Sequence, residues 1–247
     1  YALGATGGHC DSTFLPPSLE KDHKEEGIGD SIDELRYQVR RQRKYGAEVI
    51  KICATGGVFS RNTEPGQQQL SERELRVIAD EAHQWGLRVA AHAHGGDGIK
   101  AAIKAGIPVV VDKPMGRTLK ETEEIIQASK QFNTPVTTFF NRKWDSDALT
   151  IKKVISDGVI GKIFRLESRF ERFREAINPG SWRENQDASE GGGILLDLQP
   201  HLLSTALDWF GPAELVSSSI NSIRGGVDDD SVLVLKHASG VDSYLSG

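Results

Sequence analysis

The chain has 247 residues, of which 38% are hydrophobic and 26% are charged, enough for one large or two smaller globular domains. A formal net charge of −5 argues against a nucleic-acid binder or a protein of anionic membranes, and no apolar run is long enough to span a membrane. Because there are only two cysteines, Cys10 and Cys53, we expect no disulfide framework and predict a reduced, cytoplasmic protein. The chain starts with tyrosine and its only methionine is Met115, so its ends need not be natural domain ends.

The first part of the chain alternates predicted strands with predicted helices, which is typical of a parallel sheet. Short apolar runs indicate the strands, and apolar residues at helical spacing between capping residues and glycines indicate the helices. Strands are expected at 2–8, 49–57, 87–93 and 109–111, helices at about 31–45, 71–85 and 97–105, and polar loops at 12–30 and 58–70. The β-branched run at 109–111 is typical of a strand that is buried on both faces.

The second part changes to a strand-rich pattern after one more strand and helix. Helices are expected at about 118–131, 146–157 and 194–210, and strands at 135–140, 162–173, 213–222, 231–237 and 241–246. The strongly alternating segment 162–173 predicts a long, half-exposed antiparallel strand. The order of elements predicts a parallel α/β sheet of about five strands, followed by an α+β domain with an antiparallel sheet.

A lysine and a pair of histidines mark the first candidate site. Lys51 lies inside an apolar strand, where an unpaired charge would be costly to bury. His92 and His94 lie at a spacing of two on the next strand, so they point to the same side of it. Neutral imidazoles bind metal ions, and a lysine carboxylated by CO₂ would add an oxygen ligand.

The segments TGGHCD, IKICATGGVFS and QLSERELRVIADEAHQWGLRVAAHAHGGDGIKAAIKAG resemble the middle of a prolidase-type metal-dependent amidohydrolase. This resemblance covers residues 1–106 and implies a fragment of a (β/α)₈ barrel with its metal centre at the carboxyl ends of the strands. It implies that Lys51 is the carboxylated, metal-bridging lysine, that His92 is a metal ligand, and that His94 and His9 are neighbours in the site. The other ligands of the family have no counterpart here, so a zinc site would be incomplete, and we expect Lys51 and His92 to be relics.

The segments VVVDKPMGRTLKETEEIIQASKQ, FFNRKWDSDALTIKKVISDGVIGKIFRLESRFERFR, SWREN and GGGILLDLQPHLLSTALDWFG resemble the Gfo/Idh/MocA family of NAD(P)-dependent sugar and polyol dehydrogenases. This resemblance covers residues 107–247. It implies that Lys113 approaches the substrate hydroxyl and the nicotinamide ribose, and that Pro114 contacts the cofactor. It also implies that Asp197 orients the site and that His201 takes the hydroxyl proton, a role suited to histidine near neutral pH. The substrate side would be lined by Asn141, Arg142, Trp182 and Arg183.

The dinucleotide-binding turn of that family is not recognisable in the sequence. A G-x-G-x-x-G turn should follow the first strand and open a helix, because its glycines let the pyrophosphate approach the backbone. Gly4, Gly7 and Gly8 have a different spacing, and a long loop follows them. We therefore expect NAD(P) binding to be weak or absent.

These observations predict a chimera with two domains. Residues 1–140 would form a parallel α/β unit, amidohydrolase-like over 1–106 and Rossmann-like over 107–140, and residues 141–247 a truncated Gfo/Idh/MocA-like domain. Three functions remain open: an oxidoreductase-derived protein of weak or no activity, a metal-dependent amidohydrolase remnant, and a fusion or designed protein without enzymatic activity. The expected partners are a sugar or polyol and a second copy bound through the C-terminal sheet, with no nucleic acid or membrane.

Overall fold

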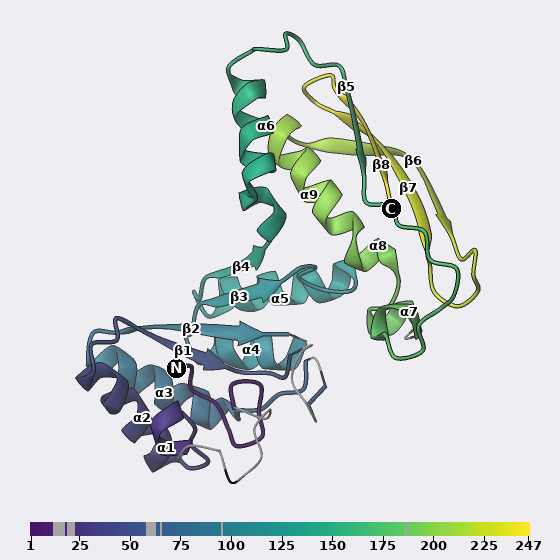
Figure 1. Ribbon diagram of the computed structural model, residues 1–247. Coiled ribbons are helices and arrows are strands. Elements are labelled where there is room, and N and C mark those ends of the chain that lie inside the picture. Colours follow the sequence, from purple (N-terminus) through teal and green to yellow (C-terminus); the bar gives the residue numbers. More distant parts are fainter. Residues whose placement is uncertain (12–17, 19–22, 58–62, 65, 95, 186) are drawn as a thin grey trace. The chain divides into compact units, whose positions relative to one another are not determined.

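The computed structural model describes residues 1–11, 18, 23–57, 63–64, 66–94, 96–185 and 187–247 (Figure 1). The predicted loops at 12–30 and 58–70 lie partly outside these described residues. The chain divides into two compact units, residues 1–139 and residues 140–247. Each unit has a four-stranded sheet of its own, so the fold is the predicted α/β sheet followed by a second sheet domain.

The first unit is a parallel sheet in which helices alternate with strands. Its elements are α1 (His23–Glu26), α2 (Ile32–Lys44), β1 (Val49–Cys53), α3 (Glu72–Gln84), β2 (Arg88–Ala93), α4 (Gly96–Lys104), β3 (Val109–Asp112), α5 (Leu119–Gln131) and β4 (Val136–Phe139). The strands lie in the order β1-β2-β3-β4 and all pairs are parallel. The order in the sheet is therefore the order in the chain.

Local capping explains where three of these helices begin. The hydroxyls of Ser31 and Thr118 accept the backbone N–H three residues further on, at the starts of α2 and α5. Ser71 and Glu74 form a full capping box at the start of α3. Gly106, which has a φ of 75°, follows α4, and such a conformation at a helix end favours glycine.

The helices cover one face of this sheet. Right-handed crossovers between strands that are sequential in the sheet place all the connecting helices on the same side. Accordingly, Val109 and Val111 are 1% and 2% exposed in the helix-facing core, whereas Val110 between them is 43% exposed. The prediction that 109–111 is buried on both faces was therefore wrong. The other face, which carries Lys51 and His92, is not covered by a layer of helices in the described part of the first unit.

The predicted strand at 2–8 forms only two isolated bridges. Leu3 pairs with Ile52 of β1, and Gly4 pairs with Ile28. The main chain then turns, and the N–H of Gly8 donates to the carbonyl of Ala5. The sheet thus has four strands, rather than the five expected, with Leu3 as a short addition beside β1.

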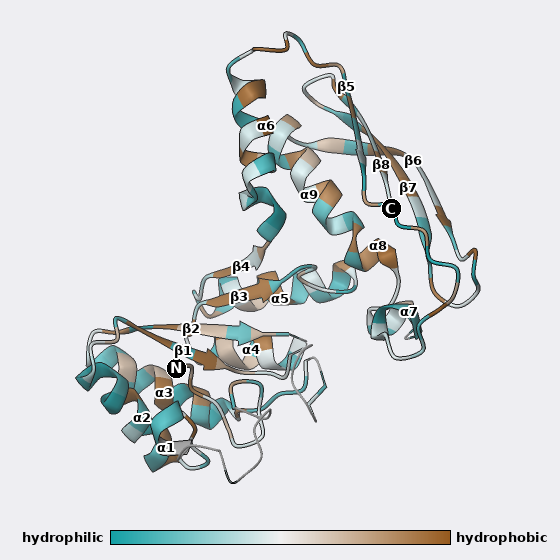
Figure 2. Cartoon of the chain, viewed as in Figure 1, coloured by the Kyte–Doolittle hydropathy of each residue, from teal (hydrophilic) through white to brown (hydrophobic). Residues whose placement is uncertain are grey.

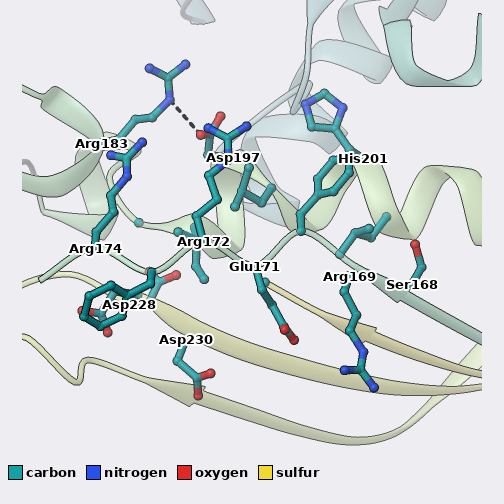
Figure 3. A pocket seen from close by; sticks show the side chains of 18 of the residues that line it. Ser168, Arg169, Glu171, Arg172, Arg174, Arg183, Asp197, His201, Asp228 and Asp230 are labelled. Atoms are coloured by element: carbon teal, nitrogen blue, oxygen red, sulfur yellow. Dashed lines mark hydrogen bonds and ion pairs between the residues drawn. The ribbon is translucent and has the colours of Figure 1, made fainter. Parts of the chain in front are cut away.

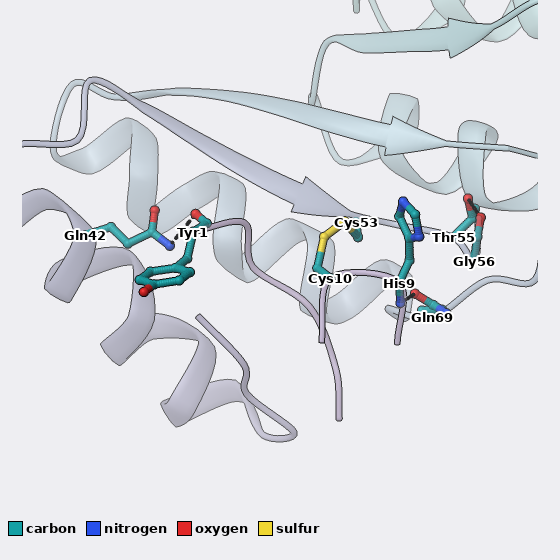
Figure 4. Close-up of a disulfide and its surroundings, with 8 residues drawn as sticks. All are labelled: Tyr1, His9, Cys10, Gln42, Cys53, Thr55, Gly56 and Gln69. Carbon is teal, nitrogen blue, oxygen red and sulfur yellow. Dashed lines mark hydrogen bonds between the residues drawn. A yellow bond between two sulfur atoms is a disulfide. The ribbon is translucent and has the colours of Figure 1, made fainter. Parts of the chain in front are cut away.

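Cys10 and Cys53 are joined by a disulfide, and their Cα atoms lie 5.9 Å apart (Figure 4). The sequence-based expectation of reduced cysteines is therefore not met in the structure, while the cytoplasmic location stays a prediction. A separation of 43 residues in the sequence gave no sign of this pairing. The pairing depends on the bridge between Leu3 and Ile52, which brings the N-terminal segment beside the end of β1.

The second unit is a mixed sheet with helices. Its elements are the 3₁₀ helix η1 (Asn141–Trp144), α6 (Ser146–Ser156), β5 (Arg165–Arg169), α7 (Trp182–Asn185), the 3₁₀ helix η2 (Ala188–Glu190), α8 (Ile194–Asp197), α9 (Gln199–Phe210), β6 (Ala213–Asn221), β7 (Asp230–His237) and β8 (Asp242–Ser246). The strand order is β5-β8-β7-β6. β5 is shorter than the segment predicted at 162–173 and pairs in parallel with β8, so its antiparallel prediction was wrong. Alternation reports which face is covered and contains no information about strand direction.

The predicted helix at 194–210 is two helices that meet at Leu198. Pro200 lies at the start of α9, and its missing N–H and its ring are incompatible with an uninterrupted helix there. Leu202 and Ala206 of α9 pack on Leu233 and Leu245 of the sheet. Figure 2 colours each residue by its hydropathy: most of α8 is hydrophobic, whereas much of α2 in the first unit is hydrophilic.

Gln199 fastens α9 to the sheet. Its side chain is 2% exposed, and its Nε2 donates to the Oγ of Ser231 at 2.9 Å and to the carbonyl of Ser231 at 3.2 Å. Its Oε1 makes no hydrogen bond to any described residue. The amide therefore holds the start of α9, where His201 lies, against β7.

No helix in the described part of the chain is long and apolar enough to cross a membrane.

Candidate functional site

Three histidines gather at the carboxyl ends of β1, β2 and β3 in the first unit. The rings of His9 and His92 stack with their centroids 4.4 Å apart, and those of His92 and His94 meet edge to face at 5.3 Å. Nε2 of His94 lies 3.7 Å from Oδ2 of Asp112. The histidines and the lysine predicted from the sequence therefore lie close enough to influence one another electrostatically.

Burial and mutual repulsion favour the uncharged form of the imidazoles in this cluster. Burial first, and then the neighbouring charges of His9, His94 and Lys51, lower the pKa of His92 to about 4, against an opposing effect of Asp112. Burial, followed by the same kind of repulsion, also lowers the pKa of His9. Loss of hydration lowers the pKa of Lys51. The imidazoles are thus neutral near pH 7, the state in which histidine accepts a proton or binds a metal.

The described residues of this cluster do not form a complete set of zinc ligands. Among the described residues, no group of three or more His, Cys, Asp or Glu side chains is arranged to hold a metal ion. Nε2 of His92 is buried and makes no hydrogen bond to a described residue, while the ring is stacked on His9. Lys51 and His92, the predicted metal residues, are brought together without a complete set of ligands.

Lys113 and Pro114 lie in the loop after β3, at the same edge of the sheet. The backbone N–H of Lys113 donates to Oδ1 of Asp112 at 2.8 Å, and the Lys113–Pro114 peptide is cis. This edge, at the carboxyl ends of parallel strands, is where open α/β sheets bind ligands. Both residues belong to the first unit, whereas Asp197 and His201 belong to the second.

One turn of the first unit joins a strand to a helix through glycines, between β2 and α4. A Cβ atom on Gly98 would lie 2.2 Å from Cγ2 of Thr55, so this glycine is required for close packing of α4. Asp97 adds a negative charge to the first turn of the helix, where a phosphate would need a positive field.

The second unit contains a cavity of about 1460 Å³ beside α8, α9 and the end of β5 (Figure 3). Asp197 and His201, the predicted orienting and proton-accepting residues, both line it, as do Arg142 and Arg183. The predicted substrate residues Asn141 and Trp182 are not among the described residues that line it. The sequence-predicted residues of this unit are thus brought together in part.

Asp197 is held by an arginine from the preceding helix. Nε of Arg183 in α7 donates to Oδ2 of Asp197 at 2.7 Å, and the Asp197 side chain is 16% exposed. The guanidinium of Arg183 also lies over the ring of Trp182, 4.6 Å from its centroid. Trp182 therefore supports Arg183, which in turn fixes the carboxylate of Asp197.

His201 lies in the first turn of α9, four residues after Asp197. Its ring meets the ring of Phe170 edge to face, with centroids 6.3 Å apart. The guanidinium of Arg142 lies 5.7 Å from the centroid of the same Phe170 ring. Phe170 thus forms an apolar wall between a histidine and an arginine, as expected in a pocket that orients a polar ligand.

A buried ion network supports the wall of the cavity. Glu184 of α7 forms ion pairs with Arg174 and with Arg224, and Nη1 of Arg224 lies 3.3 Å from Oε2 of Glu184. Nε of Arg224 also donates to Oδ2 of Asp229 at 2.8 Å. Hydrogen bonds from Asn178 and Arg174 lower the pKa of Glu184, so its charge is maintained. The network ties the segment before α7 to the turn between β6 and β7.

Several residues that line the cavity were not predicted from the sequence. They are Phe170, Arg172 and Arg174 after β5, and Asp228 to Asp230 at the start of β7. The alternation in RFERFR was a usable signal, because it places residues 170, 172 and 174 on one side of an extended chain. The three aspartates gave no signal of their own, and Asp228 has a structural role: its Oδ2 accepts the N–H of Leu195 at 2.6 Å, at the start of α8.

Two family models match this sequence. The amidohydrolase family model matches residues 5–179, which is more than half of the chain, and the GFO/IDH/MocA C-terminal domain model matches residues 148–247. The chain therefore belongs to the amidohydrolase family, with a GFO/IDH/MocA C-terminal domain at its end. The predicted chimera is confirmed, while the amidohydrolase match extends beyond the predicted join at residue 106.

The relatives fall into the same two groups. The oxidoreductase YdgJ of Escherichia coli is 40% identical over 127 residues, which are 51% of this chain and 36% of YdgJ. The ochratoxinase of Aspergillus niger is 51% identical over 79 residues, 32% of this chain and 16% of that enzyme. The scyllo-inositol 2-dehydrogenase (NADP(+)) IolW of Bacillus subtilis is 34% identical over 124 residues, 50% of this chain and 34% of IolW.

Solved structures show the same division. An NAD-binding protein from Listeria innocua has 25% identity and a TM-score of 0.61, covering 81% of this chain and 64% of that one. A Xaa-Pro dipeptidase has 28% identity and a TM-score of 0.50, covering 62% of this chain and 36% of that one. The chain spans about a third of the length of the curated oxidoreductases it matches and a smaller part of ochratoxinase.

Proposed function

We propose that this chain is an oxidoreductase-derived protein that keeps the substrate side of an NAD(P)-dependent sugar or polyol dehydrogenase. The observation that carries the proposal is the cavity of the second unit, which Asp197 and His201 both line. Nε of Arg183 lies 2.7 Å from Oδ2 of Asp197 in this cavity. The resemblance of this unit to dehydrogenases such as IolW supports the same reading. The ligand would be a small sugar or polyol.

In this proposal each residue has a defined task. His201 accepts the proton of the substrate hydroxyl. The negative carboxylate of Asp197, held by Arg183, stabilises the protonated imidazole that results. Arg142 and Arg183 orient substrate hydroxyls as hydrogen-bond donors. Lys113 and Pro114 would contact the cofactor, and Lys113 the substrate hydroxyl, while Asn141 and Trp182 support the substrate side. NAD(P), when bound, would supply the hydride acceptor.

We also propose that cofactor binding is weak or absent, and turnover with it. The packing role of Gly98 and the acidic Asp97 in the strand–turn–helix after β2 support this proposal. The test is a fluorescence titration of the protein with NADH and NADPH up to millimolar concentrations. Weak saturable binding of either cofactor supports an oxidoreductase-derived site. In a separate titration with a polyol, loss of polyol binding in His201→Asn would assign the polyol site to the cavity. No binding of either cofactor at millimolar concentration, together with no binding of a polyol, would overturn the oxidoreductase proposal.

A metal-dependent amidohydrolase remnant is the second candidate. The gathering of His9, His92 and His94 beside Lys51, together with the match to the amidohydrolase family, favours it. The test is elemental analysis of the purified protein, with Lys51→Ala as the comparison. Stoichiometric zinc that is lost in the variant would support this candidate. If neither cofactor nor metal binds, the third reading stands, a folded protein without enzymatic activity.

For the partner of this protein we propose a second copy of the chain, bound through the C-terminal sheet. β6 is the edge strand of that sheet, and Leu215, Val216 and Ile220 on it are 60%, 63% and 46% exposed. Exposed apolar edges favour pairing with another chain. Light scattering after size exclusion tests this proposal, and Val216→Lys should shift a dimer to a monomer.

A further inference from the structure

We infer that the cavity of the second unit binds a polyhydroxy carboxylate, a sugar acid, and that Arg172 is the residue that selects it. The inference rests on the proposed function, because it concerns the substrate class of the same cavity. It begins from a difference among the arginines that line that cavity. All of them except Arg172 are committed to carboxylates of the protein.

The pairs of the other five arginines are short. Arg142 lies 2.9 Å from Asp145, Arg169 lies 3.3 Å from Glu167, Arg183 lies 2.7 Å from Asp197, Arg224 lies 2.8 Å from Asp229, and Arg174 pairs with Glu184. Arg172 forms no ion pair or hydrogen bond with any residue in the described ranges 1–11, 18, 23–57, 63–64, 66–94, 96–185 and 187–247. Among the arginines that line the cavity, Arg172 is therefore the one whose charge is available to pair with a ligand.

Arg172 lies on the same side of its segment as the proposed reacting residues. Figure 3 shows Arg172, Arg174 and Arg183 on the side of Asp197 and His201, whereas Glu171 points to the opposite side. The alternation of an extended chain explains this arrangement, since residues 170 and 172 share a face. Glu171 binds Ser246 on the far side, so it does not neutralise Arg172.

Among the described residues that line the cavity, Arg172 is the arginine whose charge is not neutralised by an ion pair. Asp197 is neutralised by Arg183, and Glu184 is neutralised by Arg174 and Arg224. Asp147 and Glu175 also line the cavity without an ion pair to a described residue, and their negative charge would favour a neutral ligand. A planar guanidinium that offers two parallel N–H groups matches a carboxylate better than it matches a hydroxyl.

The distance along the chain indicates a ligand of several carbons. Phe170 contacts His201, and residue 172 lies about 6.6 Å further along at roughly 3.3 Å per residue. A carboxylate on Arg172 would thus be several bonds from a hydroxyl at His201. This separation suits a sugar acid with its carboxylate remote from the reacting hydroxyl, rather than a short 2-hydroxy acid.

Isothermal titration of the full chain, without cofactor, tests the inference with two matched six-carbon probes. D-Gluconate carries a carboxylate where D-glucitol carries a hydroxymethyl group. We expect D-gluconate to bind at least tenfold more tightly than D-glucitol, and Arg172→Gln to reduce that preference to less than about threefold. Arg172→Lys should keep part of it. Arg169→Gln is the matched control, because Arg169 is paired with Glu167, and it should keep all of it.

Equal binding of the two probes to the unaltered protein, or a preference that survives Arg172→Gln, would overturn the inference. Acetate that binds as tightly as D-gluconate would overturn the sugar part of it. Because the titration contains no cofactor, a failure of NADH or NADPH to bind leaves this result unaffected. If a cofactor binds and D-gluconate shows no preference, only the substrate class is wrong.

Discussion

The ring of His9 stacks on the ring of His92 at a centroid distance of 4.4 Å, one residue before the disulfide between Cys10 and Cys53. The backbone N–H of His9 is also held by the side chain of Gln69 at 2.9 Å. The disulfide and this hydrogen bond fix the N-terminal segment over the end of β2. The histidine cluster is therefore completed by a segment that is distant in the sequence.

The first prediction concerns the titration of His92. Its pKa of about 4 lies below the ordinary value of 6.5, so the unfolded chain binds a proton more readily than the folded chain between these values. The stability contributed by the neutral ring is present above pH 6.5 and is lost as the pH falls towards 4. NMR of the ring protons should give a midpoint near 4, and chemical unfolding should show stability falling over this range.

His92→Gln is the matched variant for this experiment. It removes the titrating ring, so the fall in stability between pH 6.5 and 4 should become shallower than in the unaltered protein. A ring that titrates near 6.5, or a pH dependence that is the same in the variant, would contradict the predicted burial of His92.

The second prediction concerns the disulfide. Closing a loop of 43 residues stabilises the folded state by about 4 kcal/mol when it acts through the entropy of the unfolded chain. Replacing both Cys10 and Cys53 with serine should lower the free energy of unfolding of the first unit by up to that amount. Urea unfolding with and without reductant measures the loss. Reductant should have no effect on the double variant, and an equal effect on both proteins would argue against the bond.

The third prediction concerns Gln199, whose buried amide joins α9 to β7. Gln199→Ala removes the hydrogen bonds to Ser231 and leaves a small cavity, so we expect the second unit to lose about 1–3 kcal/mol of stability. Thermal unfolding measures this loss. Gln127→Ala, on the exposed side of α5, is the control and should change stability by less than about 0.5 kcal/mol.

The fourth prediction concerns Glu184, the centre of the ion network beside the cavity. Glu184→Ala leaves Arg174 and Arg224 without their common carboxylate. Because Arg224 keeps Asp229 and the Arg174 side chain is 53% exposed, we expect a loss of about 1–3 kcal/mol. Glu190→Ala, at an exposed position nearby, should leave stability unchanged. A loss of less than about 1 kcal/mol in chemical unfolding of Glu184→Ala would show that the network is solvated rather than buried.

Much of the local structure was predicted from the sequence because it depends on near neighbours. The capping residues Ser31, Ser71 and Thr118 give the starts of three helices, since a cap contacts residues of the same turn. The parallel order of β1 to β4 follows from alternating strands and helices. The candidate site residues were named because each part of the chain resembles a family with ordered motifs, and their roles stay predictions.

The errors share one physical cause, which is that the decisive contact is distant in the sequence. Val110 is exposed because all the helices pack on one face of the sheet, and β5 is parallel because its neighbour is the last strand of the chain. The break between α8 and α9 at Leu198 is the exception, because its cause, Pro200, lies only two residues further on in the sequence.

The sequence by itself therefore determined the helices, the strands and the two families that meet in this chain, because these depend on spacing and on neighbouring residues. Tertiary structure alone decided which side chains share a site. It placed His9 on His92, joined Cys10 to Cys53, and left Arg172 unpaired among the described residues while Arg183 was committed to Asp197. The reason is that burial, pairing and pKa depend on distances between groups that only the folded chain brings together.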